Sequence, residues 1–156
     1  MYHIGIEPRT RKPLETPDML PNPYGSAVTI DNAKKAAAPA LEEARRNNWT
    51  MVVAIVDPGG HLVYLEKMDG APTGSVAVAT AKARSAAIFK RSTKVFQDTL
   101  AAGGDGLRVL KLEKAIPVEG GIPLVIDGKV VGAIGLSGGT SAQDGQCAQA
   151  GVNALA

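Results

Sequence analysis

The spacing of apolar residues predicts four helices and four strands in this chain. Apolar positions that recur every three to four residues indicate helices, whereas continuous or alternating apolar runs indicate strands. The predicted helices span residues 29–48, 76–91, 94–102 and 141–155, and the predicted strands span 51–56, 61–66, 122–126 and 129–136. Short turns join the strands in pairs, and such turns connect antiparallel neighbours. We therefore expect an α+β fold, with one antiparallel sheet covered by helices, and not a doubly wound parallel sheet.

Turn and capping residues support these boundaries. Asp127-Gly128 stands between two apolar strands, as in a type I′ hairpin turn. Asp57-Pro-Gly-Gly60 follows a continuously apolar run and predicts a second tight turn after a buried strand. Thr140 and Gln143 have the spacing of a capping box at the start of the last helix. Gly135 lies within the last strand, where glycine permits close backbone approach.

The first 28 residues differ from the rest of the chain. They contain five of the 10 prolines and have no apolar periodicity. We expect an extended arm over residues 1–28, either disordered or wrapped around a neighbouring subunit. The remaining residues, 29–156, are long enough for one domain with its own core.

Composition excludes several classes of function. The net charge is only +2, and no long basic run is interleaved with aromatic residues, so nucleic acid is not an expected partner. The single cysteine, Cys147, excludes an internal disulfide and fits a reducing compartment. The N-terminus lacks the pattern of a signal peptide, and no apolar run approaches the roughly 20 residues of a membrane span. We expect a cytoplasmic protein without a membrane partner.

A basic stretch built on small residues is the clearest candidate for chemistry. Five basic residues and no acid lie between positions 70 and 97: Lys82, Arg84, Lys90, Arg91 and Lys94. The Ala, Val and Ser residues between them let a helix lie close to a sheet or another chain, so the pattern predicts a site for a small anionic ligand. Lys82 and Arg84 point roughly 200° apart on a helix and face different sides. The alternative is a solvated surface.

Other motifs offer weaker candidates. Gly135-Leu-Ser137-Gly-Gly139 matches G-x-S-x-G, but both histidines, His3 and His61, precede it, so we do not expect a serine nucleophile. The backbone N–H groups from Ser137 onward begin a helix and suit an anion, although Asp144 in the first turn competes. His61 is a haem ligand, a general base or an exposed residue past a turn. Glu119 is an acid/base group or, as we expect, an ion-pair partner of Arg84.

Several ordered motifs together resemble a known family. They are Val56-Asp57-Pro-Gly-Gly60 with Lys67-Met-Asp-Gly-Ala71, Lys82-Ala-Arg-Ser-Ala-Ala-Ile-Phe-Lys-Arg-Ser-Thr93, Gly120-Gly-Ile-Pro123, Val131-Gly-Ala-Ile-Gly-Leu-Ser-Gly138 and Gln143-Asp144. The set is similar to the GlcG/HbpS-like haem-binding family, which includes the C-terminal domain of PduO-type proteins. The resemblance covers about residues 26–156. It implies a five-stranded antiparallel sheet flanked by helices, homo-oligomers, and either haem or corrinoid binding or a role in a catabolic operon.

Two main hypotheses follow from the residues and the resemblance. The first is an oligomeric protein that binds haem or another anionic planar ligand or carboxylate. The second is a cofactor-independent catabolic enzyme, an isomerase, hydrolase or lyase acting on a small unsaturated or hydroxy carboxylate. We assign ligand binding to Lys82, Arg84, Arg91, Gly120, Gly121 and Ser137, proton transfer to His61, Glu119 and Asp57, and axial iron ligation to His61. A third hypothesis is an oligomeric accessory protein whose charges only hold subunits together.

Overall fold

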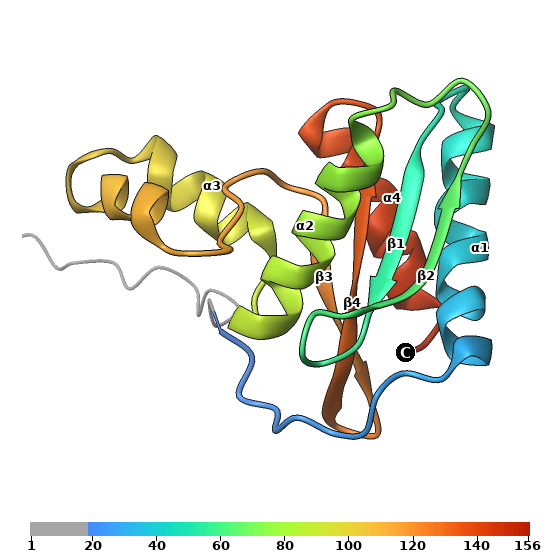
Figure 1. Cartoon of the computed structure of the whole chain (residues 1–156), viewed down its shortest axis with the longest axis horizontal. Helices are drawn as coiled ribbons and strands as arrows, with labels where there is room; N and C mark the ends of the chain where they lie inside the picture. Colours follow the sequence, from blue (N-terminus) through green and yellow to red (C-terminus); the bar gives the residue numbers. More distant parts are fainter. Residues whose placement is uncertain (1–18) are drawn as a thin grey trace, which may run out of the picture.

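The structure is a computed structural model that describes residues 19–156. Its elements in chain order are α1 (Ile30–Arg46), β1 (Val52–Val56), β2 (Leu62–Lys67), α2 (Ser75–Phe89), α3 (Thr93–Ala101), the 3₁₀ helix η1 (Gly104–Lys111), β3 (Gly121–Ile126), β4 (Lys129–Ser137) and α4 (Ser141–Asn153) (Figure 1). The predicted α+β arrangement is confirmed. The 3₁₀ helix stands where the sequence predicted only a glycine-rich break.

The sheet has four strands in the order β2-β1-β4-β3, and each neighbouring pair is antiparallel. The expectation of five strands was wrong for the described residues. Residues before α1 run beside β4 but form no further strand: they make one isolated bridge, between Tyr24 and Val130, and one more backbone bond, from the Val28 N–H to the Val131 carbonyl. Pro21 and Pro23 flank this bridge, and neither has the backbone N–H that a strand ladder requires.

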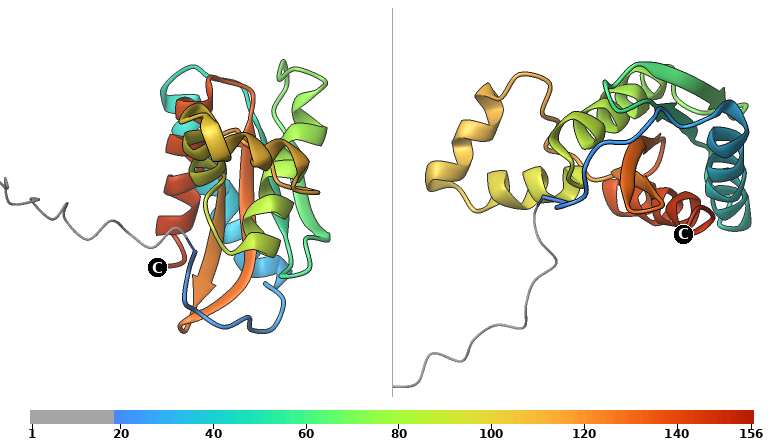
Figure 2. Two further views of the ribbon diagram at one scale, coloured as in Figure 1. Left: turned by 90° about the vertical axis from the view of Figure 1, so that its left-hand side faces the viewer. Right: turned by 90° about the horizontal axis from the view of Figure 1, so that it is seen from below.

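Helices cover both faces of the sheet. Helices α1 and α4 lie together on one face, and α2 crosses the other face over β1, β3 and β4 (Figures 1 and 2). The core on the α1 and α4 side contains Leu41, Met51, Ile55, Leu124 and Ile134. The core on the α2 side is built mainly of alanines and valines. Because these side chains are small, α2 lies unusually close to the sheet.

Gly135 shows how close this approach is. A Cβ atom at Gly135 would overlap the carbonyl oxygen of Ala79 and lie 2.6 Å from the backbone nitrogen of Ala83. Only glycine leaves this space, which confirms the close approach expected within the last strand. Helix α2 therefore packs directly on β4 at Ala79 and Ala83.

Local signals at the turns and helix ends are also confirmed. Asp127 and Gly128 have φ of 51° and 73°, as a type I′ turn requires. The Thr140 hydroxyl accepts a bond from the Gln143 backbone N–H, and the Gln143 side chain accepts one from the Thr140 N–H, which completes the capping box. Lys90 ends α2 in the left-handed conformation, with φ of 49°.

The described part of the expected N-terminal arm packs on its own chain. The Leu20 N–H donates to the carbonyl of Lys90, and the Tyr24 hydroxyl donates to that of Ala87 at 2.7 Å. The Lys90 ammonium donates to the carbonyl of Asn22 at 3.0 Å. Residues 19–28 thus run across the end of α2, while residues 1–18 of the expected arm lie outside the described residues.

A projecting arm leaves the body of the molecule after α2. It comprises α3, η1 and the return segment to Val118, and it extends away from the sheet in two perpendicular views (Figure 1 and the right-hand view of Figure 2). Within residues 19–156, no helix combines the length and apolar character needed to cross a membrane.

Candidate functional site

Helix α2 directs its two central basic residues to opposite sides. Lys82 reaches Gly120 and Asp144, next to β3 and α4. Arg84 lies against Gly60, in the turn between β1 and β2. The opposite orientation expected from the sequence is therefore confirmed, and the predicted site residues divide into two separate clusters.

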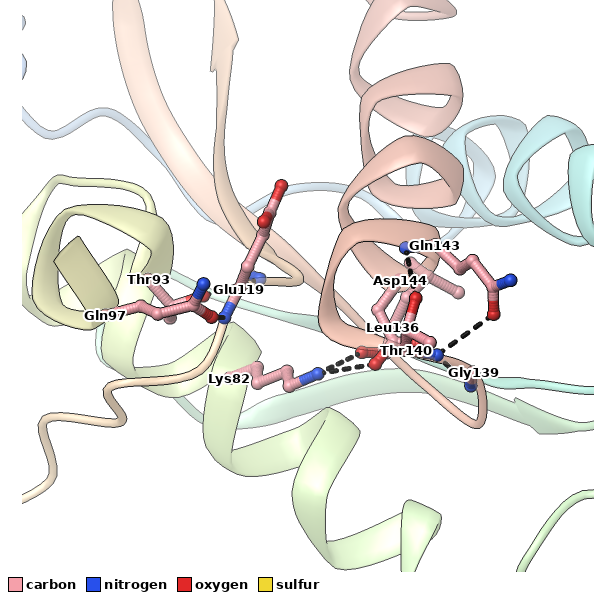
Figure 3. Close-up of polar contacts among 10 residues, drawn as sticks. Lys82, Thr93, Gln97, Glu119, Leu136, Gly139, Thr140, Gln143 and Asp144 are labelled. Atoms are coloured by element: carbon pink, nitrogen blue, oxygen red, sulfur yellow. Dashed lines mark hydrogen bonds and ion pairs between the residues drawn. The ribbon is translucent and has the colours of Figure 1, made fainter. Parts of the chain in front are cut away.

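The Lys82 cluster is a buried ion pair. The Lys82 side chain is 1% exposed, and its ammonium donates to Asp144 Oδ2 at 2.8 Å and to the Leu136 carbonyl at 3.0 Å (Figure 3). The backbone of Gly120 lies directly above the ammonium, because a Cβ atom there would be 2.9 Å from Nζ. The charge of Lys82 is therefore matched inside the protein by a carboxylate.

Asp144 also occupies the anion position at the start of α4. Its Oδ1 accepts the Gly139 N–H at 3.0 Å, and the neighbouring Gly138 N–H also favours the charged carboxylate. Burial raises the pKa of Asp144, and the Lys82 ammonium and these two N–H groups oppose that shift without cancelling it. The anion that suits this helix start is therefore supplied by the chain itself.

Glu119 lies beside this pair but does not join it. Its backbone N–H donates to Gln97 Oε1 at 2.8 Å, and its carboxylate extends away from Lys82 toward Gly145 of α4 (Figure 3). No ion pair joins Glu119 to Arg84 within residues 19–156, so the expected pairing was wrong: the two residues lie on opposite sides of α2.

Gly120 and Gly121 make room for this arrangement. Gly120 has φ of 132°, and Gly121 is packed against the backbone of Lys82. The Gly121 N–H donates to the hydroxyl of the buried Thr93 at 2.9 Å. Sequence reasoning did not assign Thr93 or Gln97, whose only signals are a helix-start position and a helical face. The two glycines thus serve packing around the ion pair.

The second cluster is built on the turn after β1. Asp57 Oδ1 accepts the backbone N–H groups of Gly59 at 2.9 Å and His61 at 3.0 Å. The same oxygen lies 3.3 Å from His61 Nδ1. The imidazole is 83% exposed. When Nδ1 carries the proton and donates to Asp57, the Nε2 lone pair remains free to bind a metal ion or take a proton.

Arg84 supports the same turn from beneath. A Cβ atom at Gly60 would lie 2.6 Å from Arg84 Cγ, so the arginine stem occupies the space that this glycine leaves. The Nε atom of Arg84 is buried and has no hydrogen-bond partner within the described part of the chain. Arg84 thus packs against the turn that carries Asp57 and His61, and we call these three residues a cluster because one turn brings together an exposed imidazole and a partly buried cation.

The other predicted residues lie apart from this turn. Arg91 is held where α2 meets α3: its Nε donates to the Phe89 carbonyl at 3.3 Å, and its guanidinium lies 5.4 Å from the ring centre of Phe96. Ser137 is buried at the end of β4, opposite Val52.

The family described as "Haem degrading protein HbpS-like" matches residues 28–153, which is most of the chain. The chain belongs to the HbpS-like family. This HbpS-like chain is 39% identical to Protein GlcG of Escherichia coli (strain K12) over 105 residues, which cover 67% of this chain and 77% of that protein.

Solved structures agree with this assignment. A crystal structure of a PduOC:heme complex has a TM-score of 0.74 and 29% identity, and the match covers 83% of this chain and 95% of the other. A crystal structure of HbpS has a TM-score of 0.76 and 28% identity, with coverage of 85% and 92%. The GlcG/HbpS-like family expected from the motifs is therefore confirmed.

Proposed function

We propose that this HbpS-like protein binds haem or a closely related anionic planar ligand at the Asp57, His61 and Arg84 cluster. Membership of the HbpS-like family and the likeness to a PduOC:heme complex support haem-related binding as the class of function. The orientation of His61 is the main support for placing the ligand at this turn, because its Nδ1 faces Asp57 while the ring is open to solvent.

The imidazole of His61 suits axial ligation of iron. A histidine that binds a metal commonly donates its other ring N–H to a carboxylate, which fixes the tautomer and raises the basicity of the ligating nitrogen. Asp57 is in position to do this, and its own orientation is fixed by the Gly59 and His61 backbone N–H groups. The cluster therefore fits haem, which would supply the redox and ligand-binding chemistry of its iron when bound.

Arg84 suits the carboxylates of such a ligand. A guanidinium matches the geometry of a carboxylate and can bind it through two hydrogen bonds. Within residues 19–156, no protein atom accepts a bond from Arg84 Nε, whereas the charge of Lys82 is already matched by Asp144. The proposed ligand site therefore includes Arg84 and omits Lys82, whose role is to hold α2, β4 and α4 together.

Titration of the protein with haem tests this proposal. Wild type is expected to develop a Soret band at one equivalent of haem, and His61→Ala should lose the ligation-dependent part of that spectrum. His3→Ala is the matched control, since it removes the other histidine of the chain. Arg84→Gln should weaken haem binding about tenfold, while leaving the spectrum of the saturated complex unchanged. A wild-type protein that gives no spectral change would overturn the proposal.

The same cluster supports a second candidate, a cofactor-independent enzyme that acts on a small carboxylate. An imidazole oriented by a carboxylate can serve as a general base, and Arg84 would hold the substrate. Glu119 is not part of this candidate, because it lies on the other side of α2. Turnover of a hydroxy or unsaturated acid by haem-free protein, abolished by His61→Ala, would favour the enzyme over the binding protein.

Two further expectations belong to this proposal. We place the protein in the cytoplasm, because its single, buried Cys147 fits a reducing compartment. We also propose that it works as a homo-oligomer, as the resemblance to the GlcG/HbpS-like family implies.

A further inference from the structure

A cavity of about 340 Å³ lies where the last turn of α1 meets the end of β2. Figure 1 shows these two ends at the same edge of the molecule. Position 67 lies about 17 Å along β2 from Leu62, the residue after His61, so this cavity is separate from the site proposed for haem. The residues that line it are Arg45 from α1, Glu66 and Lys67 from β2, and Met68 and Asp69 from the loop that follows.

Backbone contacts hold the rim of this cavity in place. The Met68 N–H donates to the Met51 carbonyl at 3.0 Å. The Ala71 N–H donates to the Met68 carbonyl at 3.1 Å, which closes a tight turn whose third residue, Gly70, has φ of 80°. The Met68 sulfur accepts the Met51 N–H at 3.4 Å, so this thioether is held between the core and the cavity. The lining side chains therefore project from a helix end, a strand end and a turn that are all tied to the body of the protein.

The charges that line the cavity balance one another. Arg45 and Lys67 are cations, and Glu66 and Asp69 are carboxylates, so the lining has no net charge. A ligand with a single charge would meet like charges as well as opposite ones in such a site. A ligand that carries both an ammonium and a carboxylate can place each group beside the opposite charge. The lining therefore favours a zwitterion over a simple anion or cation.

Contacts within the protein leave these charges available to a ligand. Arg45 Nη2 lies 4.0 Å from Glu66 Oε2, a long distance for an ion pair, and both side chains are about half exposed. The Tyr64 hydroxyl donates to the other oxygen of Glu66 at 2.6 Å, which holds that carboxylate in place. Lys67 and Asp69 form no ion pair within the described residues. An exposed pair at this distance contributes little to stability, so a ligand can replace it with little loss.

We propose that this cavity binds a small zwitterion, an α-amino acid with an uncharged aliphatic or thioether side chain. The ligand carboxylate contacts Arg45 and Lys67, and the ligand ammonium contacts Glu66 and Asp69. The ligand side chain packs on the thioether of Met68. The size also fits, since about 340 Å³ is at the lower end of the range of roughly 300–1,000 Å³ that is typical of small-molecule sites.

Isothermal titration calorimetry of the full chain with three probes of one carbon skeleton tests the proposal. L-Leucine carries both charges, 4-methylpentanoate lacks the ammonium, and isopentylamine lacks the carboxylate. We expect L-leucine to bind saturably at one site per chain. Each probe with a single charge should bind at least about tenfold more weakly, because it leaves two of the lining charges without a partner. No saturable binding of L-leucine, L-alanine or L-methionine, or equal binding of the three leucine-like probes, would overturn the proposal.

Two charge variants test which residue meets which group of the ligand. Lys67→Met should weaken L-leucine binding about tenfold and reduce its advantage over isopentylamine, because the lost cation faces the carboxylate. Asp69→Asn should instead reduce the advantage over 4-methylpentanoate. Lys35→Met, which changes an exposed lysine of α1, is the matched control and should bind L-leucine as wild type does. If Lys67→Met and Asp69→Asn also bind it like wild type, the cavity is only a solvated charged surface. Haem binding is a separate measurement, so either proposal can fail without the other.

Discussion

Replacing Lys82 by methionine should be among the most damaging single changes in this protein. Methionine fills much the same volume but leaves the buried carboxylate of Asp144 without its cation, while two backbone N–H groups still contact it. Removing one partner of a buried ion pair typically destabilises a protein by about 3–5 kcal/mol. We expect a loss of that size for Lys82→Met. The matched control is Lys94→Met, which breaks an exposed ion pair with Asp98 and should change stability little.

The pH dependence of this loss follows from Asp144. Its pKa is raised in the folded protein, so the folded state binds this proton more readily than the unfolded state does. This contribution is therefore most favourable at low pH and diminishes as pH rises through the raised pKa. Lys82 opposes the shift, so its removal raises the pKa of Asp144 further. The deficit of Lys82→Met should accordingly be smaller near pH about 5 than near pH about 7.

Urea unfolding followed by circular dichroism measures these differences. In the K82M/D144N double variant, the asparagine oxygen can still accept the Gly139 N–H but carries no charge. We expect it to recover at least about 1–2 kcal/mol of the Lys82→Met loss. A Lys82→Met variant as stable as Lys94→Met, or a deficit that responds neither to pH nor to Asp144→Asn, would refute the assignment of Lys82 as a structural residue.

Two further predictions concern buried positions. Gly135→Ala should destabilise the protein by about 1–3 kcal/mol, because the new Cβ would meet the backbone of Ala79. The control is Gly145→Ala, whose Cβ would meet only the flexible side chain of Glu119 and which should be neutral or stabilising. Urea unfolding measures both variants, and equal effects would contradict this packing. Burial raises the pKa of the Cys147 thiol to about 12. At pH about 8, native protein should therefore react with a thiol reagent roughly a thousandfold more slowly than the unfolded chain, and rapid labelling of native protein would contradict this. The raised pKa should also stabilise the fold below pH about 9, and this contribution should fade at higher pH.

The elements of the fold were largely predictable because their signals are local. The type I′ turn at Asp127-Gly128 and the capping box at Thr140 each depend on residues within a few positions of one another. The same is true of the opposite directions of Lys82 and Arg84, which follow from helical spacing. Four strands were visible in the apolar pattern itself, whereas the fifth came only from the family resemblance, and two prolines beside Tyr24 explain its absence from the described residues.

The partners of the charged residues depend on the tertiary structure. Lys82 and Asp144 are 62 positions apart, and nothing in the spacing of either residue identifies the other. They meet because α2 packs on β4 through glycine and alanine contacts, which brings the middle of α2 to the start of α4. The expected pairing of Glu119 with Arg84 failed for the same reason, since the two residues lie on opposite sides of α2. Local sequence patterns specify the α-helices, the four strands, the turns and the family, but not the 3₁₀ helix η1. Which charges are neutralised inside the protein depends on packing, because those partners come from distant parts of the chain and meet only in the folded structure.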